Sequence, residues 1–91
     1  MEEVRNNIDR IDAQIVKLIA ERGSFVKQAS KFKKDSNDVK APQRVEAVIQ
    51  KVRNLATDYG ADPDMIEQIY RVMISGFINM EMDEFKKHKE L

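Results

Sequence analysis

The fold is decided by the stretch from Val4 to Lys33, which reads VRNNIDRIDAQIVKLIAERGSFVKQASKFK. Taken in alternating steps of four and three residues, this stretch has an apolar side chain at every position but one. These positions, here called the apolar seam, are Val4, Ile8, Ile11, Ile15, Leu18, Arg22, Phe25, Ala29 and Phe32. Such a period is that of one face of an α-helix, and no proline interrupts it. The stretch therefore predicts one long amphipathic helix over residues 2–34.

Arg22 is the exception in the apolar seam. A guanidinium keeps its charge even when it is buried, so either an anion meets it or the side chain reaches water. An arginine at such a position is most often a snorkelling or salt-bridged residue. Arg22 alone therefore does not indicate a ligand site.

The first helix is too long for the chain that carries it. About 30 residues extend ~45 Å at 1.5 Å per residue. A compact chain of 91 residues has a radius of gyration of only about 12 Å. We therefore expect the far end of this helix to pack against another chain.

Two shorter helices are predicted after a polar break at residues 35–38. The second covers residues 42–59, because Pro42 suits the first position of a helix and Gly60 suits the residue that follows the last one. The third covers residues 63–86, with Asp62 as its N-cap. The chain is thus predicted to be a single all-α domain, residues 1–91, with three helices.

Composition excludes several classes of protein. The 16 basic and 16 acidic residues balance, which argues against general binding to nucleic acid or to an anionic membrane. There is no cysteine and only one histidine, His88, so we predict neither a disulfide nor a metal site. No apolar run approaches the roughly 20 residues that span a bilayer, and the N-terminus does not resemble a signal peptide. We expect a cytoplasmic protein.

Four polar residues lie on or beside the apolar faces of the predicted helices. They are Arg22, Lys33, Arg44 and Glu81. Each has an ordinary explanation by itself: Lys33 could be a solvated cation near a helix end, Arg44 a surface arginine, and Glu81 a salt-bridge partner. Together, three cations and one carboxyl facing one interior suit an anion pocket better than a core. A small dianionic ligand would satisfy the otherwise costly guanidinium.

Arg5 borders the same face of the first helix. It is separated from Lys33 by 28 residues, or about 42 Å along a straight helix, so the two cannot share a pocket within one chain. Two antiparallel first helices would bring Arg5 of one chain beside the far half of the other, which favours a two-fold dimer with two shared pockets. Pairing of Arg5 with Asp9 or Asp12 explains the residue equally well.

Several segments, in order, resemble the all-helical (type II) chorismate mutase family. They are Arg5-x-x-Ile8-Asp9-x-Ile11-Asp12, Leu18-Ile19-Ala20-Glu21-Arg22, Val26 to Lys33, Ala41-Pro42-Gln43-Arg44-Val45 and Phe77-Ile78-x-x-Glu81. The resemblance covers nearly the whole chain. It implies an intertwined homodimer that rearranges chorismate to prephenate in the shikimate pathway of aromatic amino acid biosynthesis, without a cofactor.

The resemblance also implies roles for particular residues. Arg5 resembles the arginine contributed by the partner chain, Arg22 the main carboxylate clamp, and Arg44 the arginine that opens the second helix. Lys33 resembles the lysine that contacts a carboxylate and the ether oxygen of the substrate, and Glu81 occupies the position that donates a hydrogen bond to that oxygen. Lys33, Glu81 and Arg22 are the predicted catalytic residues.

The chain differs from the enteric bifunctional members of the family at three positions. Those members carry Asp, Glu and Ser where this chain has the apolar residues Ala41, Val45 and Phe77. Val45 and Phe77 are predicted to line the substrate pocket. In these positions the chain is closer to isochorismate–pyruvate lyases, which share the fold. Lyase activity is therefore the first alternative, followed by a 4-amino-4-deoxychorismate mutase and by a non-catalytic helical dimerisation module. The sequence leaves open any association with a larger pathway enzyme.

Overall fold

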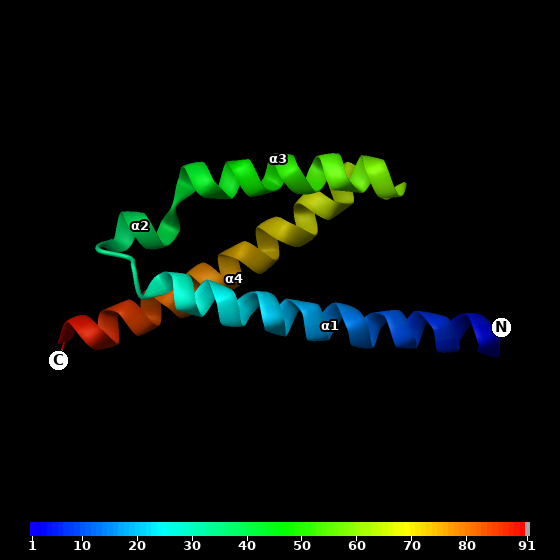
Figure 1. Ribbon diagram of the computed structural model, residues 1–91, viewed down its shortest axis with the longest axis horizontal. Coiled ribbons are helices and arrows are strands. Elements are labelled where there is room, and N and C mark those ends of the chain that lie inside the picture. The colour runs from blue at the N-terminus through cyan, green and yellow to red at the C-terminus, as the bar shows by residue number, and fades with distance from the viewer. Residues whose placement is uncertain (91) are drawn as a thin grey trace. The chain divides into compact units, whose positions relative to one another are not determined.

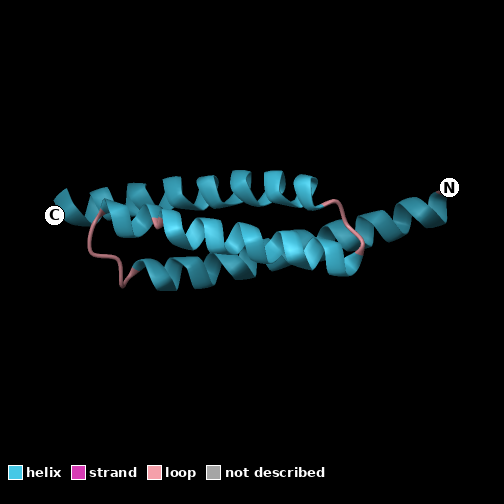
Figure 2. Cartoon of the chain, turned by 90° about the horizontal axis from the view of Figure 1, so that it is seen from above, coloured by secondary structure: helices cyan, strands magenta, loops and turns pink. Residues whose placement is uncertain are grey.

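The computed structural model describes the backbone of residues 1–90 and the side chains of residues 1–87. The helices in these residues are α1 (Glu2–Ser30), α2 (Ser36–Lys40), α3 (Pro42–Tyr59) and α4 (Pro63–Glu90) (Figure 1). Short loops connect them, and no strand occurs within residues 1–90 (Figure 2). The predicted all-α fold with three long helices is confirmed.

Three predicted details of the helices were wrong. The first helix ends at Ser30 instead of residue 34, and the supposed break at residues 35–38 contains most of the short helix α2. The last helix continues to Glu90 instead of ending at residue 86. Lysine and glutamate are good helix formers, and extending an existing helix costs little, so the charged end of α4 stays helical.

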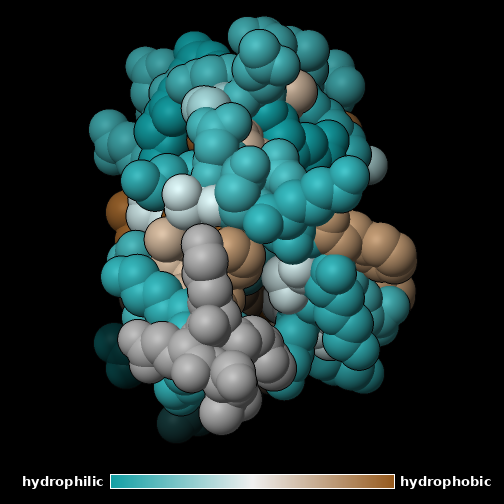
Figure 3. All heavy atoms as spheres, turned by 90° about the vertical axis from the view of Figure 1, so that its left-hand side faces the viewer, coloured by the Kyte–Doolittle hydropathy of each residue, from teal (hydrophilic) through white to brown (hydrophobic). Residues whose placement is uncertain are grey.

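The chain divides into two units, Met1–Phe32 and Lys33–Leu91, and each is described by itself. The first unit consists of α1 and the two residues after it. No residue of α1 is buried, and the aliphatic residues of its apolar seam are strongly exposed. Their exposed fractions are 56% for Val4, 52% for Ile8, 44% for Ile11, 48% for Ile15 and 61% for Leu18. Figure 3 views the whole chain from one end and shows hydrophobic residues lying between hydrophilic ones on that face.

The second unit has its own hydrophobic core, formed where α3 packs against α4. Val48, Ile49 and Val52 of α3 and Ile74 of α4 form the buried cluster. Burying an aliphatic side chain of this size contributes about 1.5–3 kcal/mol, so this cluster is the main source of cohesion between the two helices. Val45, Ile66, Tyr70 and Ile78 pack around it.

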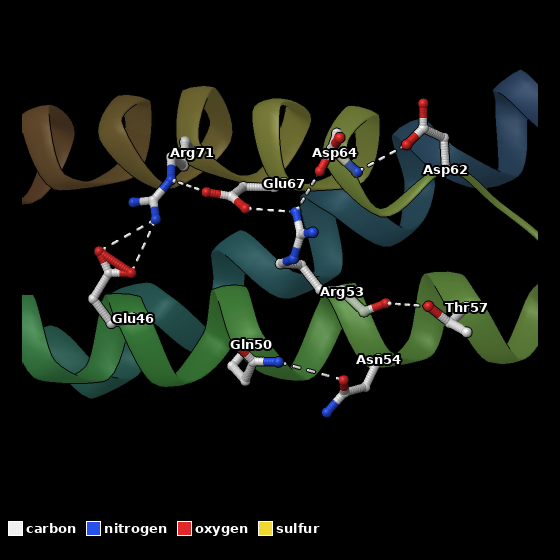
Figure 4. Close-up of polar contacts among 9 residues, drawn as sticks. All are labelled: Glu46, Gln50, Arg53, Asn54, Thr57, Asp62, Asp64, Glu67 and Arg71. Carbon is white, nitrogen blue, oxygen red and sulfur yellow. Dashed lines mark hydrogen bonds and ion pairs between the residues drawn. The ribbon is translucent and has the colours of Figure 1, made fainter.

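A chain of ion pairs joins α3 to α4 along one side of this core (Figure 4). Arg71 reaches Glu46 at 2.9 Å and Glu67 at 2.8 Å, and Glu67 in turn accepts from Arg53 at 2.8 Å. Arg53 also meets Asp64 at 2.9 Å. The hydrogen bond from Arg71 holds the pKa of Glu67 below its ordinary value. These alternating charges bridge the two helices.

The loop between α3 and α4 follows the predicted pattern. Gly60 ends α3 in the left-handed region, at φ 76°, where its backbone N–H bonds to carbonyls of the last turn. Asp62 then accepts a hydrogen bond from the backbone N–H of Asp64 at 2.9 Å. Both predicted helix boundaries in this loop are therefore confirmed.

Helix α2 packs on α4, and its residue Val39 is only 3% exposed. Asp35 caps its first turn by accepting a hydrogen bond from the backbone N–H of Asp38 at 2.9 Å. Ala41 both ends α2 and begins α3, and it adopts the left-handed conformation at φ 38°. Few residues other than glycine adopt this conformation, so the junction is strained.

Candidate active site

Lys33 is the first residue of the second unit, in the segment that leads from α1 to α2. Its side chain is half-buried, and its Nζ donates a hydrogen bond to the backbone carbonyl of Asp38 at 3.0 Å. An ammonium has three N–H groups, so two remain for a ligand. Lys33 is therefore a restrained cation that still has donors to offer.

Glu81 lies on α4 and is the electrostatic neighbour of Lys33. Its Oε2 atom is buried and has no hydrogen-bond partner among the side chains and backbone that the structure describes. Burial raises the pKa of the Glu81 carboxyl, and the positive charge of Lys33 offsets only part of that effect. A buried carboxyl oxygen without a partner is costly, which makes this atom ready to bond a ligand when it carries a proton.

Three more of the predicted site residues lie on the two helices of the core. Arg44 is in the first turn of α3 with its side chain exposed, and Val45 beside it packs against the hydrophobic cluster. Phe77 is half-buried on α4, one turn before Glu81, so both lie on the same side of that helix. The second unit thus holds Lys33, Arg44, Val45, Phe77 and Glu81.

Arg5 and Arg22 are both on α1. The side chain of Arg5 is exposed and that of Arg22 is half-buried. Since α1 belongs to the other unit, the place of these two arginines relative to Lys33 and Glu81 stays a prediction. The side chain of His88 lies outside the described residues.

Asp38 is not among the residues predicted from the sequence, but it contacts the segment that carries Lys33. Three of its groups bond the segment that carries Lys33: its carbonyl accepts from Lys33, its Oδ2 accepts from the backbone N–H of Lys34, and its own N–H donates to Asp35. The available signal was the spacing Asp35-x-x-Asp38, which is typical of a capped helix start and was interpreted as a break.

No helix among the described residues has an apolar stretch long enough to cross a membrane. Within the same residues, no group of three His, Cys, Asp or Glu side chains is arranged to hold a metal ion.

Comparison with known proteins assigns the chain to a family. The chorismate mutase type II family matches residues 4–82. The chain is 34% identical over 76 residues to an isochorismate pyruvate lyase of Pseudomonas aeruginosa, a match that covers 84% of this chain and 75% of that protein. It is 32% identical over 73 residues to a chorismate mutase of Methanocaldococcus jannaschii, covering 79% and 74%. A bifunctional chorismate mutase/prephenate dehydratase of Aquifex aeolicus is 31% identical over 85 residues, a match that covers 89% of this chain and 24% of that longer protein. This chain belongs to the chorismate mutase type II family.

Proposed function

We propose that the chain is a chorismate mutase that rearranges chorismate to prephenate in a cationic pocket shared by two copies of the chain. The observation that carries this proposal is the pair formed by Lys33 and Glu81. Lys33, a cation with unused donors, is the electrostatic neighbour of the half-buried carboxyl of Glu81, whose Oε2 is buried and whose pKa is raised. Such a pair can provide two hydrogen-bond donors to one ligand oxygen.

The reaction needs positioning and charge stabilisation. As chorismate rearranges, its ether C–O bond breaks while a new C–C bond forms, and no proton has to be transferred. Negative charge develops on the ether oxygen, so donors aimed at that atom lower the barrier. Lys33 and protonated Glu81 would supply them. An ionised Glu81 would instead repel the developing charge.

The two carboxylates of the substrate need cations that bind them in a fixed orientation. A guanidinium forms paired hydrogen bonds with a carboxylate, which suits Arg22 and Arg44 to this role. In the proposed dimer Arg5 of the partner chain closes the pocket. Val45 and Phe77 would line it around the ring.

The exposed apolar seam of α1 supports the dimer. Side chains such as Ile11 and Ile15 recur on one face over the length of a 29-residue helix, yet none of them is buried. Contiguous exposed apolar surface of this kind marks an interaction site. A second α1, antiparallel to the first, would cover it and would carry Arg5 to the other end of the helix pair.

Isochorismate–pyruvate lyase activity is the second candidate. The similarity to the Pseudomonas aeruginosa lyase favours it, and so do the apolar side chains at Val45 and Phe77. Elimination of pyruvate from isochorismate breaks the same kind of enolpyruvyl ether bond, so Lys33 and Glu81 could serve either reaction. The two candidates differ in the ring that the pocket accepts.

The deciding experiment is a paired assay of the purified protein, with chorismate in one reaction and isochorismate in the other. Prephenate and salicylate are separated by chromatography and quantified. Faster formation of prephenate supports the mutase, and predominant salicylate supports the lyase. Absence of both products would contradict the proposed function.

A further inference from the structure

We propose that Asp38 is a positioning residue that holds the Lys33 ammonium beside Glu81. This inference rests on the proposed function for the role of Lys33, but the contacts that carry it belong to the second unit alone. Asp38 itself would not touch the substrate. It would act through Lys33.

The segment of residues 31–35 has no regular structure that could fix a side chain by itself. A lysine has a flexible four-carbon stem, and its ammonium samples a wide volume unless something restrains it. Asp38 provides the restraint from three directions. Its carbonyl holds the Lys33 Nζ at 3.0 Å, its Oδ2 holds the Lys34 amide at 3.0 Å, and its amide is held by Asp35 at 2.9 Å.

The restraint is tied to the helix that carries Glu81. Val39, next to Asp38, is only 3% exposed. Helix α2, which contains both residues, packs on α4. Movement of Asp38 away from this arrangement would disturb the burial of its neighbour Val39, which is unfavourable because apolar surface would return to water. Because Asp38 belongs to α2, which packs on α4, its hydrogen bond to Lys33 would keep the ammonium at a fixed place relative to α4.

The side chain and the backbone of Asp38 make different hydrogen bonds in this restraint. The carbonyl that binds Lys33 remains in any substitution, whereas the Oδ2 that holds the Lys34 amide is lost in Asp38→Ala. In Asp38→Asn the side-chain amide oxygen can still accept that bond. The two variants thus separate loss of the acceptor from loss of the charge.

The kinetic test compares Asp38→Ala, Asp38→Asn and a control, Asp58→Ala, in the full chain. Asp58 is an exposed carboxylate on α3 and controls for the loss of one negative charge. A misplaced donor lowers the rate of the chemical step more than it weakens substrate binding. We expect Asp38→Ala to lower kcat about tenfold while KM changes less than about threefold. Asp38→Asn should restore most of kcat, and Asp58→Ala should match the unsubstituted protein.

A merely structural role gives another pattern. If Asp38→Ala lowers the melting temperature but leaves the kcat of the folded protein unchanged, the proposal is wrong. It is also wrong if Asp38→Asn loses as much kcat as Asp38→Ala, because the acceptor is then not what matters.

Amide hydrogen exchange of the unsubstituted protein provides a test that needs neither a variant nor activity. The Lys34 amide is expected to exchange slowly because Asp38 Oδ2 accepts its hydrogen bond. Fast exchange of this amide would overturn the proposal even if Asp38→Ala does not fold. If Lys34 is protected but neither chorismate nor isochorismate reacts, the restraint stands and the proposed function fails.

Discussion

Helix α1 and the pair formed by α3 and α4 have similar amphipathic sequences but opposite surroundings. The pair buries Val48, Ile49 and Val52 against Ile74 within one chain and adds ion pairs along its side. Helix α1 is longer than α3 and buries no residue at all. Hydrophobic periodicity therefore predicts that a helix has an apolar face, but not which chain will cover that face.

The largest expected effect comes from placing a charge in the apolar seam of α1. We expect Ile11→Asp to raise the dissociation constant of the dimer on the order of 10²-fold or more, because an unpaired carboxylate would be buried at the interface. Activity should fall with it. Sedimentation at several protein concentrations measures the effect.

Val16→Asp is the matched control for this change. Val16 is 67% exposed and lies outside the apolar seam, so its substitution should leave the dimer intact. If the unsubstituted protein is a monomer, or if Ile11→Asp dimerises as tightly as Val16→Asp, the proposed role of α1 is wrong.

The second effect concerns the polar position of the same seam. Arg22→Ala should lower kcat/KM about 10²-fold or more, since a charged clamp on the substrate is lost, while the dimer stays folded. Arg10→Ala, on the exposed side of α1, should have little effect. Unfolding of Arg22→Ala would instead make Arg22 a structural residue.

A third test moves to the second unit and uses pH. The raised pKa of Glu81 means that its protonated, donating form is lost as pH rises through that value, so activity should fall, by at least about tenfold, towards alkaline pH. Glu81→Gln keeps a donor at all pH values and should flatten the profile, whereas Asp83→Asn should not. A flat profile for the unsubstituted protein would exclude this role of Glu81.

The same pKa shift affects folding. Burial disfavours the charged form of Glu81, so its contribution to stability is greatest when the carboxyl is protonated and is lost as pH rises through the raised pKa. Glu81→Gln should therefore melt at a higher temperature than the unsubstituted protein at neutral pH, and this difference should disappear in acid. Thermal unfolding at the two pH values measures it.

The smallest effect is expected at two left-handed residues of the second unit. Ala41→Gly should stabilise the protein by about 0.5–1 kcal/mol, because relief of strain slightly exceeds the entropy cost of glycine. Gly60→Ala should destabilise it by about 1 kcal/mol. Urea unfolding measures both, and changes of equal sign would contradict the assignment of strain to Ala41.

The sequence alone predicted most of the fold, because the periods of the three long helices are regular and Gly60 and Asp62 mark a boundary clearly. It missed α2, since five residues are too few to show a period. In steps of four and three, the predicted apolar face of α3 is Val45, Val48, Val52, Leu55 and Tyr59. The structure instead buries Ile49 and Ala56 and leaves Leu55 41% and Tyr59 85% exposed. The face that α4 covers depends on packing that spacing within α3 does not encode.

For the candidate site, the roles assigned to the predicted residues stay predictions. Charges on apolar faces pointed to Lys33 and Glu81, which the structure makes electrostatic neighbours. Asp38 was missed because it contributes a backbone carbonyl, which every residue has, and because its carboxylate bonds a backbone amide only after α2 has formed. The roles of the arginines on α1 stay predictions.

The strained residue between α2 and α3 has a consequence for recombination with related chains. Since Ala41 ends one helix and begins the next, no spare residue separates them. An inserted residue would rotate what precedes it by about 100° relative to α3, as each residue of a helix does. We therefore expect a chimera that joins two family members at the junction of α2 and α3 to tolerate exchange of side chains but not a change in residue count.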